Sequence, residues 1–165
     1  MKTKTQKIVI ASLLAALCCT ATMIIKIPSP LKGYINLGDC VVLLSGWLLS
    51  PMYAFFCAGA GSALADIFSG YVVYAPATFI IKGIMAIIAY LCHKGLHNKI
   101  GNTPARVIGG TLAEIAMILG YFIFEGFLYG FAPSAINIPA NAVQGVAGVI
   151  IGIILIKIFE KTKLF

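Results

Sequence analysis

Four ionisable side chains lie within or at the ends of long apolar runs: Asp66, Lys82, Glu114 and Glu125. A charged side chain at the centre of a lipid bilayer costs at least about 2.5–3.5 kcal/mol, so such residues usually face the protein interior, where they pair or bind something. Counting along the runs places Lys82 and Glu125 at similar depth near one membrane surface. Glu114 lies about 16 Å along its helix from Glu125, at a rise of 1.5 Å per residue. These residue types favour a polar site for a charged or hydrogen-bonding solute, and the alternative is a structural ion pair between Lys82 and Glu125.

Other polar residues share helix faces or connections with this site. Tyr121 lies four residues before Glu125, and Asn141 and Gln144 lie on one face of the last apolar run, just after Asn137. Tyrosine rings near the same surface could contact a ring compound. The candidate substrate-binding residues are Tyr34, Asn36, Tyr74, Lys82, Tyr121, Glu125, Asn137, Asn141 and Gln144.

Several polar residues also have purely structural interpretations. Asn141 and Gln144 could hydrogen bond between helices, as polar residues commonly do in membranes. Asp66 is interpreted as a cap for the connection 69–75 rather than as a ligand residue. For Glu114, a hydrogen bond between helices and a functional role are both open.

The composition nearly excludes a water-soluble fold. Of the 165 residues, 61% are apolar and only 10% are charged, and the mean hydropathy is +1.02, whereas a soluble domain carries roughly a quarter charged residues. At about 20 residues per crossing, the length allows at most about six or seven crossings. We therefore expect one integral-membrane domain over 1–165.

The apolar runs predict an all-α membrane protein, a compact bundle of six transmembrane helices with both termini cytoplasmic. The second run is too short to span alone, but splitting it from the third at Ser50 and Pro51 puts every basic cluster on the cytoplasmic side. Proline also suits the first turn of a helix, where its missing N–H costs nothing. The external connections are then 28–39, 69–75 and 129–137. The runs are 8–27, 40–49, 52–68, 76–93, 105–128 and 138–158.

Charge and motifs disfavour several functional classes. Nine of the twelve basic residues flank apolar runs, so the net charge of +7 does not predict nucleic-acid binding. The five cysteines lack Cys-x-x-Cys spacing, and we expect no metal site and no cofactor. The sequence has no G-x-x-x-x-G-K-S/T phosphate loop, no H-E-x-x-H and no G-x-S-x-G motif, so we do not expect an enzyme.

Two other functional classes stay open as alternatives. A small intramembrane enzyme would use Asp66, Glu114 and Glu125 for acid–base or metal chemistry, but the depth spread between the two glutamates argues against a catalytic pair. A regulatory subunit without a ligand would leave the polar helix faces unexplained.

Three stretches resemble the substrate-binding S components of energy-coupling factor (ECF) vitamin transporters. They are Asn-Leu-Gly-Asp at 36–39, Gly-Ser-Ala-Leu-Ala-Asp-Ile-Phe-Ser-Gly-Tyr at 61–71 and Tyr-Ala-Pro-Ala-Thr-Phe-Ile-Ile-Lys-Gly at 74–83. They are most similar to the branch that includes hydroxymethylpyrimidine-type and pyridoxine-type S components, and a little less to the riboflavin members. Ser50 departs from the glycine expected before Pro51, which bears on that turn only.

The resemblance implies a subunit of a multi-pass transporter in a prokaryotic plasma membrane. Such a subunit captures a vitamin or precursor from outside with high affinity, in a pocket made by the first external loop and the outer ends of segments four to six. It then associates with a transmembrane coupling subunit and two cytoplasmic ATPases, and topples to release its cargo inside. In the family, an A-x-x-x-A face on helix one docks the coupling subunit, and Ala11 and Ala15 match it. The alternative for these two alanines is packing within the subunit.

The residues restrict the ligand class but do not identify the ligand. Two carboxylates on segment five against one lysine favour a small polar ring compound with a basic nitrogen or an amine. Hydroxymethylpyrimidine, a pyridoxine vitamer and a queuosine precursor all fit this description, and riboflavin stays an alternative. The C-terminal half resembles no single vitamin subfamily.

Overall fold

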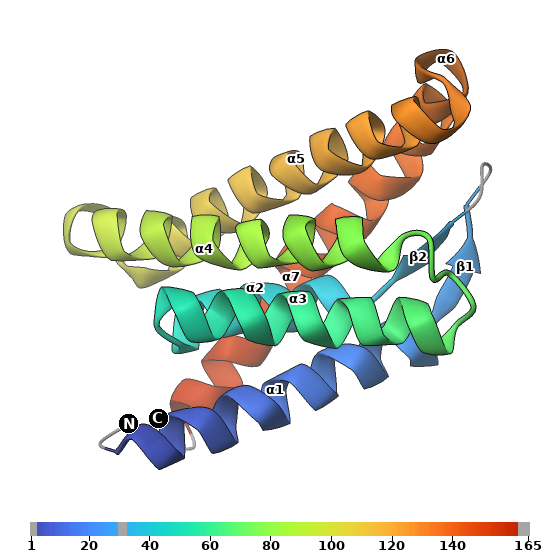
Figure 1. Cartoon of the computed structure of the whole chain (residues 1–165). Coiled ribbons are helices and arrows are strands. Elements are labelled where there is room, and N and C mark those ends of the chain that lie inside the picture. The colour runs from blue at the N-terminus through green and yellow to red at the C-terminus, as the bar shows by residue number, and fades with distance from the viewer. Residues whose placement is uncertain (1–2, 30–32, 162–165) are drawn as a thin grey trace.

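The protein is a nearly all-helical bundle, in a computed structural model that describes residues 3–29 and 33–161. The long helices run roughly along one direction and a small β-hairpin lies at one end (Figure 1). The elements are α1 (Lys4–Ile24), β1 (Lys26–Pro28), β2 (Tyr34–Asn36), α2 (Gly38–Leu48), α3 (Pro51–Phe68), α4 (Ala75–Ile100), α5 (Asn102–Tyr129), α6 (Phe131–Ser134), the 3-10 helix η1 (Ala135–Asn137) and α7 (Ile138–Lys161).

Among the described residues, five helical stretches are long and apolar enough to cross a membrane: Lys4–Ile24, Pro51–Phe68, Ala75–Ile100, Asn102–Tyr129 and Phe131–Lys161. The second of the six predicted segments corresponds to α2, which has only 11 residues. At 1.5 Å per residue, α2 is about 16 Å long, roughly half the thickness of the hydrocarbon core. The all-helical membrane class is confirmed, whereas six crossings and the cytoplasmic position of the termini stay predictions.

Helix α2 lies inside the bundle, against α1, α3, α4 and α7. Every residue from Gly38 to Trp47 is buried. Glycines allow this close packing: a Cβ atom on Gly46 would lie 2.5 Å from the backbone oxygen of Ala86 in α4. The same holds between α3 and α1, where a Cβ on Gly61 would lie 2.5 Å from the backbone oxygen of Ala15. Small residues of this kind let helix backbones approach closely in lipid.

The predicted break before Pro51 is present. Helix α2 ends at Leu48, and Pro51 occupies the first turn of α3. Because of this break, α2 runs away from the β-hairpin and α3 returns towards it (Figure 1). The hairpin itself was not predicted: β1 and β2 pair antiparallel, with Ile27 opposite Ile35, inside the connection expected only to be rich in turns.

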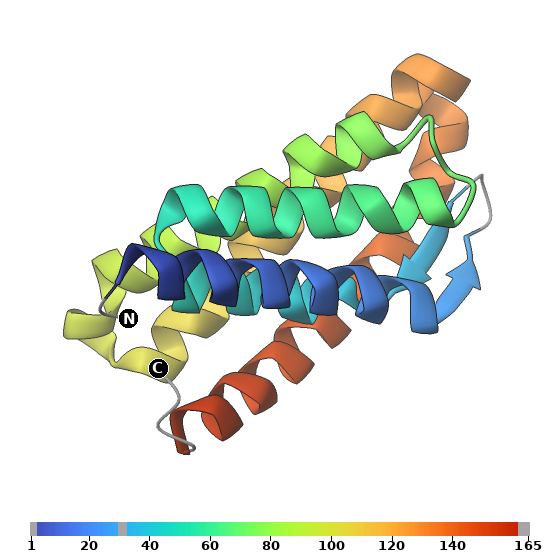
Figure 2. The same ribbon diagram turned by 60° about the horizontal axis from the view of Figure 1, so that its bottom comes forward.

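The two ends of the bundle differ in character. The start of α1 and the end of α7 lie together at one end, which we call the terminus end, and the hairpin, the α3–α4 connection and α6 lie at the other, the hairpin end (Figures 1 and 2). Near the terminus end, Arg106 of α5 pairs with Glu160 of α7 at 2.7 Å. The tyrosine-rich connections are therefore gathered at the hairpin end, where they build the site described next.

Candidate ligand-binding site

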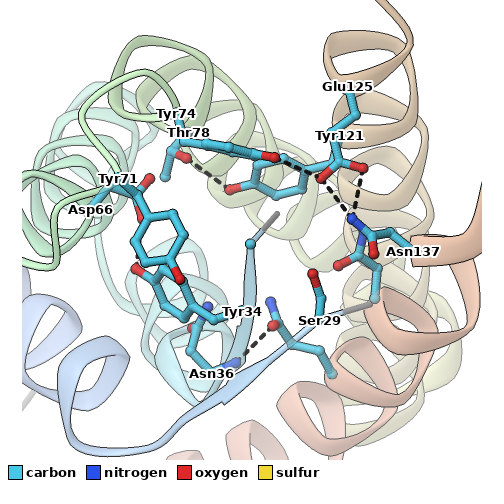
Figure 3. Close-up of a pocket in the computed structure, with 13 residues that line it drawn as sticks. Ser29, Tyr34, Asn36, Asp66, Tyr71, Tyr74, Thr78, Tyr121, Glu125 and Asn137 are labelled. Carbon is cyan, nitrogen blue, oxygen red and sulfur yellow. Dashed lines mark hydrogen bonds between the residues drawn. The ribbon is translucent and has the colours of Figure 1, made fainter. Parts of the chain in front are cut away.

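A small space, which we call the hairpin cavity, lies between the hairpin and the ends of α3, α4, α5 and α7 (Figure 3). Its volume is about 40 Å³. Its lining is almost entirely polar or tyrosine, in a protein that is otherwise strongly apolar. The lining residues are Ser29, Gly33, Tyr34, Asn36, Asp66, Tyr71, Tyr74, Thr78, Tyr121, Glu125, Asn137, Asn141 and Gln144.

Eight of the nine candidate binding residues from the sequence line this one cavity, and Lys82 is the exception. The structure adds lining residues that the candidates did not include, among them Asp66, Tyr71 and Thr78. The sequence could have indicated Thr78, because it precedes the candidate Lys82 by one helical turn and so lies on the same helix face. Tyr71 had only its place in a tyrosine-bearing connection.

Glu125 presents a carboxylate that is held from two other elements. Asn137 of η1 donates its side-chain N–H groups to both carboxylate oxygens, each at 3.0 Å. The Tyr74 hydroxyl, just before α4, donates to Oε1 at 3.3 Å (Figure 3). Glu125 is only 3% exposed. Because its position is fixed by these donors, the carboxylate is oriented before any ligand arrives.

Asp66 supplies a second carboxylate on the other side of the cavity (Figure 3). The Tyr34 hydroxyl of β2 donates to its Oδ1 at 2.6 Å. Burial raises the pKa of Tyr34 above its usual range, so this hydroxyl stays protonated and acts as a donor. The interpretation of Asp66 as a cap for the following connection holds for its backbone oxygen, which accepts from the Tyr71 N–H at 2.8 Å. Its side chain faces the cavity.

Lys82 does not lie where the sequence placed it. It was expected on the wall opposite Glu125, or paired with Glu125, but its ammonium pairs with Asp39 of α2 beneath the cavity. It also lies 3.2 Å from the sulfur of Met117 and 5.5 Å from the centre of the Tyr121 ring. The position of Lys82 along its helix indicates its depth in the membrane but not which helix faces it, and the sequence places Asp39 in an external connection.

The ionisable groups of the cavity lining that carry charge are therefore all acidic. Among the described residues that line it, Asp66 and Glu125 are acidic, and none is lysine, arginine or histidine. Within 3–29 and 33–161, no group of three or more His, Cys, Asp or Glu side chains is arranged to hold a metal ion. Such a lining suits hydrogen-bond donors and cations.

Glu114 does not line the hairpin cavity. It is buried between α5 and α7, and neither of its carboxylate oxygens has a hydrogen-bond partner in the described structure. A Cβ atom on Gly145 or Gly148 would lie 2.9 Å from its side chain. Of the two interpretations left open for Glu114, the hydrogen bond between helices is not formed among the described residues, and the side chain lies outside the hairpin cavity.

A family model described as the S component of an ECF-type riboflavin transporter matches residues 2–161. The chain belongs to this S component family. ECF S components are transporter subunits that handle a small-molecule substrate with membrane coupling and ATPase subunits. The subunit is thus a multi-pass membrane protein rather than a soluble one.

Two relatives and one solved structure are similar to this S component. A Pyrococcus woesei protein, described as an uncharacterized protein in gap 3′region, is 38% identical over 133 residues, 79% of this chain and 86% of its own length. The thiamine precursor transporter HmpT of Lactococcus lactis subsp. cremoris (strain MG1363) is 24% identical over 136 residues, 82% of this chain and 75% of its own. The solved S component of a bacterial ECF transporter is 23% identical, with a TM-score of 0.79 over 99% of this chain and 100% of its own, which shows the fold.

The comparisons confirm the expected family at the level of the S component. They do not confirm the hydroxymethylpyrimidine branch, because the family model is named for riboflavin and the relative named for a thiamine precursor is distant.

The S component also has a groove on its side, between α1 and α3. Ala11 and Ala15, the two candidate docking residues, both line it and are half-buried. Its volume is about 440 Å³, and its walls include Ser12, Tyr53 and Phe56. The backbone of Ala15 packs on Gly61 while its side chain lines the groove, so packing within the subunit and docking can both use this helix.

Proposed function

We propose that this S component captures a small ring compound with a basic nitrogen or an amine in the hairpin cavity. It then delivers the compound across the membrane, together with a transmembrane coupling subunit and two cytoplasmic ATPases. The observation that carries this proposal is the lining of the cavity: two carboxylates, four tyrosines and four side-chain amides, with no cationic side chain among its described residues.

The acidic lining of the cavity favours a ligand that donates hydrogen bonds. Asp66 and Glu125 approach the ligand space from different sides, so a compound with donors at both ends could contact both (Figure 3). Hydrogen bonds between ionised partners are roughly twice as strong as neutral ones. A phosphate or carboxylate ligand would instead meet two carboxylates without a balancing cation, because the Lys82 ammonium is already paired with Asp39.

The tyrosines argue for a flat ring. The Tyr34 and Tyr71 ring centres are 4.9 Å apart, and Tyr71 and Tyr74 are 6.3 Å apart. These rings present faces and edges to the cavity, and aromatic faces attract both other rings and cations. A cationic heterocycle combines both properties.

The size of the cavity favours a one-ring compound. A volume of about 40 Å³ corresponds to about three water molecules. A single pyrimidine or pyridine ring therefore requires the tyrosine side chains to move apart modestly, whereas a three-ring flavin requires a much larger change. Hydroxymethylpyrimidine or a pyridoxine vitamer is our first candidate, and the name of the Lactococcus relative supports it. Riboflavin is the second candidate, because the family model carries its name, and a queuosine precursor is an alternative of intermediate size.

Mass spectrometry of the compounds released from purified, denatured S component tests this proposal. We expect a near-stoichiometric small molecule with a basic nitrogen and a single ring or a compact fused ring. A flavin would colour the preparation yellow and overturn the size argument. A stoichiometric anionic compound would overturn the charge argument, and no compound after purification from several growth media would contradict high-affinity capture.

We further propose that the hairpin end faces the outside and that both termini are cytoplasmic, in a prokaryotic plasma membrane. The support is the positive-inside rule, since basic residues of the described chain concentrate towards the terminus end. They are Lys4, Lys7, Lys94, Lys99, Arg106, Lys157 and Lys161.

Cysteine labelling tests this orientation. In a variant without Cys19 and Cys92, which are only partly buried, a cysteine at Val72 in the α3–α4 connection should react with an impermeant reagent added to intact cells. A cysteine at Lys99 should react only after the membrane is opened. The reverse pattern would invert the topology and place the hairpin cavity inside the cell.

A further inference from the structure

A series of hydrogen bonds joins the buried Asp39–Lys82 ion pair to the hairpin. The Gln144 side chain of α7 donates from Nε2 to Asp39 Oδ2 at 2.6 Å. Its Oε1 accepts the backbone N–H of Asn36, in β2, at 2.8 Å. Asp39, Lys82 and Gln144 are 0%, 2% and 3% exposed. Four separate elements, α4, α2, α7 and β2, therefore meet through one carboxylate and one amide.

The ion pair fixes which way the Gln144 amide points. An amide has one acceptor end and one donor end, whereas an ionised carboxylate only accepts. Because Asp39 requires the donor end of Gln144, the acceptor end must face Asn36. A flipped amide would bring its NH₂ group against the backbone N–H of Asn36, so that two donors would meet and one buried donor would be left unpaired.

The Lys82 ammonium is the cation that pairs with the buried Asp39 side chain. An ionised carboxylate is costly to bury unless a cation is close and its remaining oxygen is hydrogen-bonded. Lys82 satisfies Oδ1 and Gln144 satisfies Oδ2. Neither Asp39 nor Lys82 lines the hairpin cavity, so their influence on it must pass through other residues.

We propose that the Asp39–Lys82 pair is a positioning element, which acts through Gln144 to hold β2 and its cavity-lining residues Tyr34 and Asn36 against α7. The pair sets the wall of the cavity without touching the ligand. The Asn36 side chain extends the connection, because its Oδ1 accepts the Gly38 N–H at 2.8 Å, at the start of the helix that carries Asp39. The part of this inference that concerns ligand affinity rests on the proposed function, and the part that concerns hairpin order does not.

Hydrogen exchange of the hairpin tests the inference without any ligand. Removing Asp39 alone would leave Lys82 as an unpaired buried charge and endanger folding, so the pair is removed together in Asp39→Asn/Lys82→Met. The amide of Asn36 should then exchange about threefold to tenfold faster, the range expected for one lost hydrogen bond. Gln144→Leu, which cuts the connection and keeps the ion pair, should produce the same increase.

The combination of the two changes distinguishes positioning from general stabilisation. Because both act on the same contact, adding Asp39→Asn/Lys82→Met to Gln144→Leu should not raise exchange at Asn36 further. The matched control is Arg106→Met/Glu160→Gln, which removes another interhelical ion pair, between α5 and α7 near the terminus end, and should leave hairpin exchange unchanged.

Three results would overturn the inference: unchanged hairpin exchange with a lowered midpoint of thermal unfolding, strictly additive effects, or an equal increase in Arg106→Met/Glu160→Gln. The same variants are then titrated with 4-amino-5-hydroxymethyl-2-methylpyrimidine and with riboflavin. If the exchange pattern holds but neither compound nor any released compound binds the unaltered protein, the proposed function fails and the positioning role stands. Where a compound binds, its affinity should fall equally in Gln144→Leu and in the double variant.

Discussion

Replacing Ala11 or Ala15 with leucine is expected to reduce uptake by the complete transporter at least about tenfold, with ligand binding to the isolated S component unchanged. Both side chains line the groove between α1 and α3, and a larger side chain there would hold a partner helix away from the backbone of α1. The hairpin cavity is built from other residues, so it should keep its affinity. Uptake is measured in proteoliposomes that contain the S component, the coupling subunit and both ATPases.

A matched control lies on the same helix. Leu13 is 65% exposed and does not line the groove, so Leu13→Trp adds bulk to α1 without entering it and should leave uptake unchanged. Normal uptake and normal co-purification of the coupling subunit with both alanine variants would show that α1 is not the docking face. A loss of ligand binding in the isolated variants would show instead that the α1–α3 packing had been damaged.

The helical architecture was predictable because lipid leaves few alternatives for an apolar chain. Backbone groups in the hydrocarbon region must be hydrogen-bonded within the segment, so long apolar runs become helices. Pro51 marked the break between α2 and α3 for a local reason, its missing N–H. The hairpin was not predictable in the same way, because each strand has only three residues, too few for an alternating pattern.

The composition of the cavity was largely predictable, but its charge partners were not. Polar residues such as Glu125, Asn137 and Gln144 are rare in this apolar sequence. Their positions along the predicted segments place all three near the hairpin end. The pairing of Lys82 depends on which helix faces it, and that is set by the buried position of α2. Asp39 belongs to one of the stretches that resemble S components, and this resemblance is what could have identified it. The predicted segments instead place it in a connection, whereas it lies at the start of a buried helix.

Gln144 shows why predicting a location is not the same as predicting a role. The sequence placed it among the binding residues, and the structure does place it at the cavity. Both ends of its amide are nonetheless occupied, by Asp39 and by the backbone of Asn36. Its contribution to affinity is therefore expected to come mainly from holding the hairpin.

Glu125→Gln is expected to weaken binding of an amine-bearing or cationic ligand at least about tenfold. The change keeps the shape of the side chain and removes its charge, so it separates electrostatics from packing. Truncating one side of a desolvated charge contact typically costs about 2–5 kcal/mol, which is roughly 30-fold to several thousand-fold in affinity. The variant should still fold, because a glutamine oxygen can accept one of the two hydrogen bonds that Asn137 now donates to the carboxylate.

Calorimetric titration of the compound recovered from the purified protein, into the unaltered S component, Glu125→Gln and Glu114→Gln, tests the central claim most directly. The account predicts a large loss of affinity in Glu125→Gln and little or none in Glu114→Gln, because Glu114 is equally buried but lies outside the hairpin cavity. Equal and small losses in both variants would contradict it, since the carboxylates would then be structural and the ligand would be held by the loops and tyrosines.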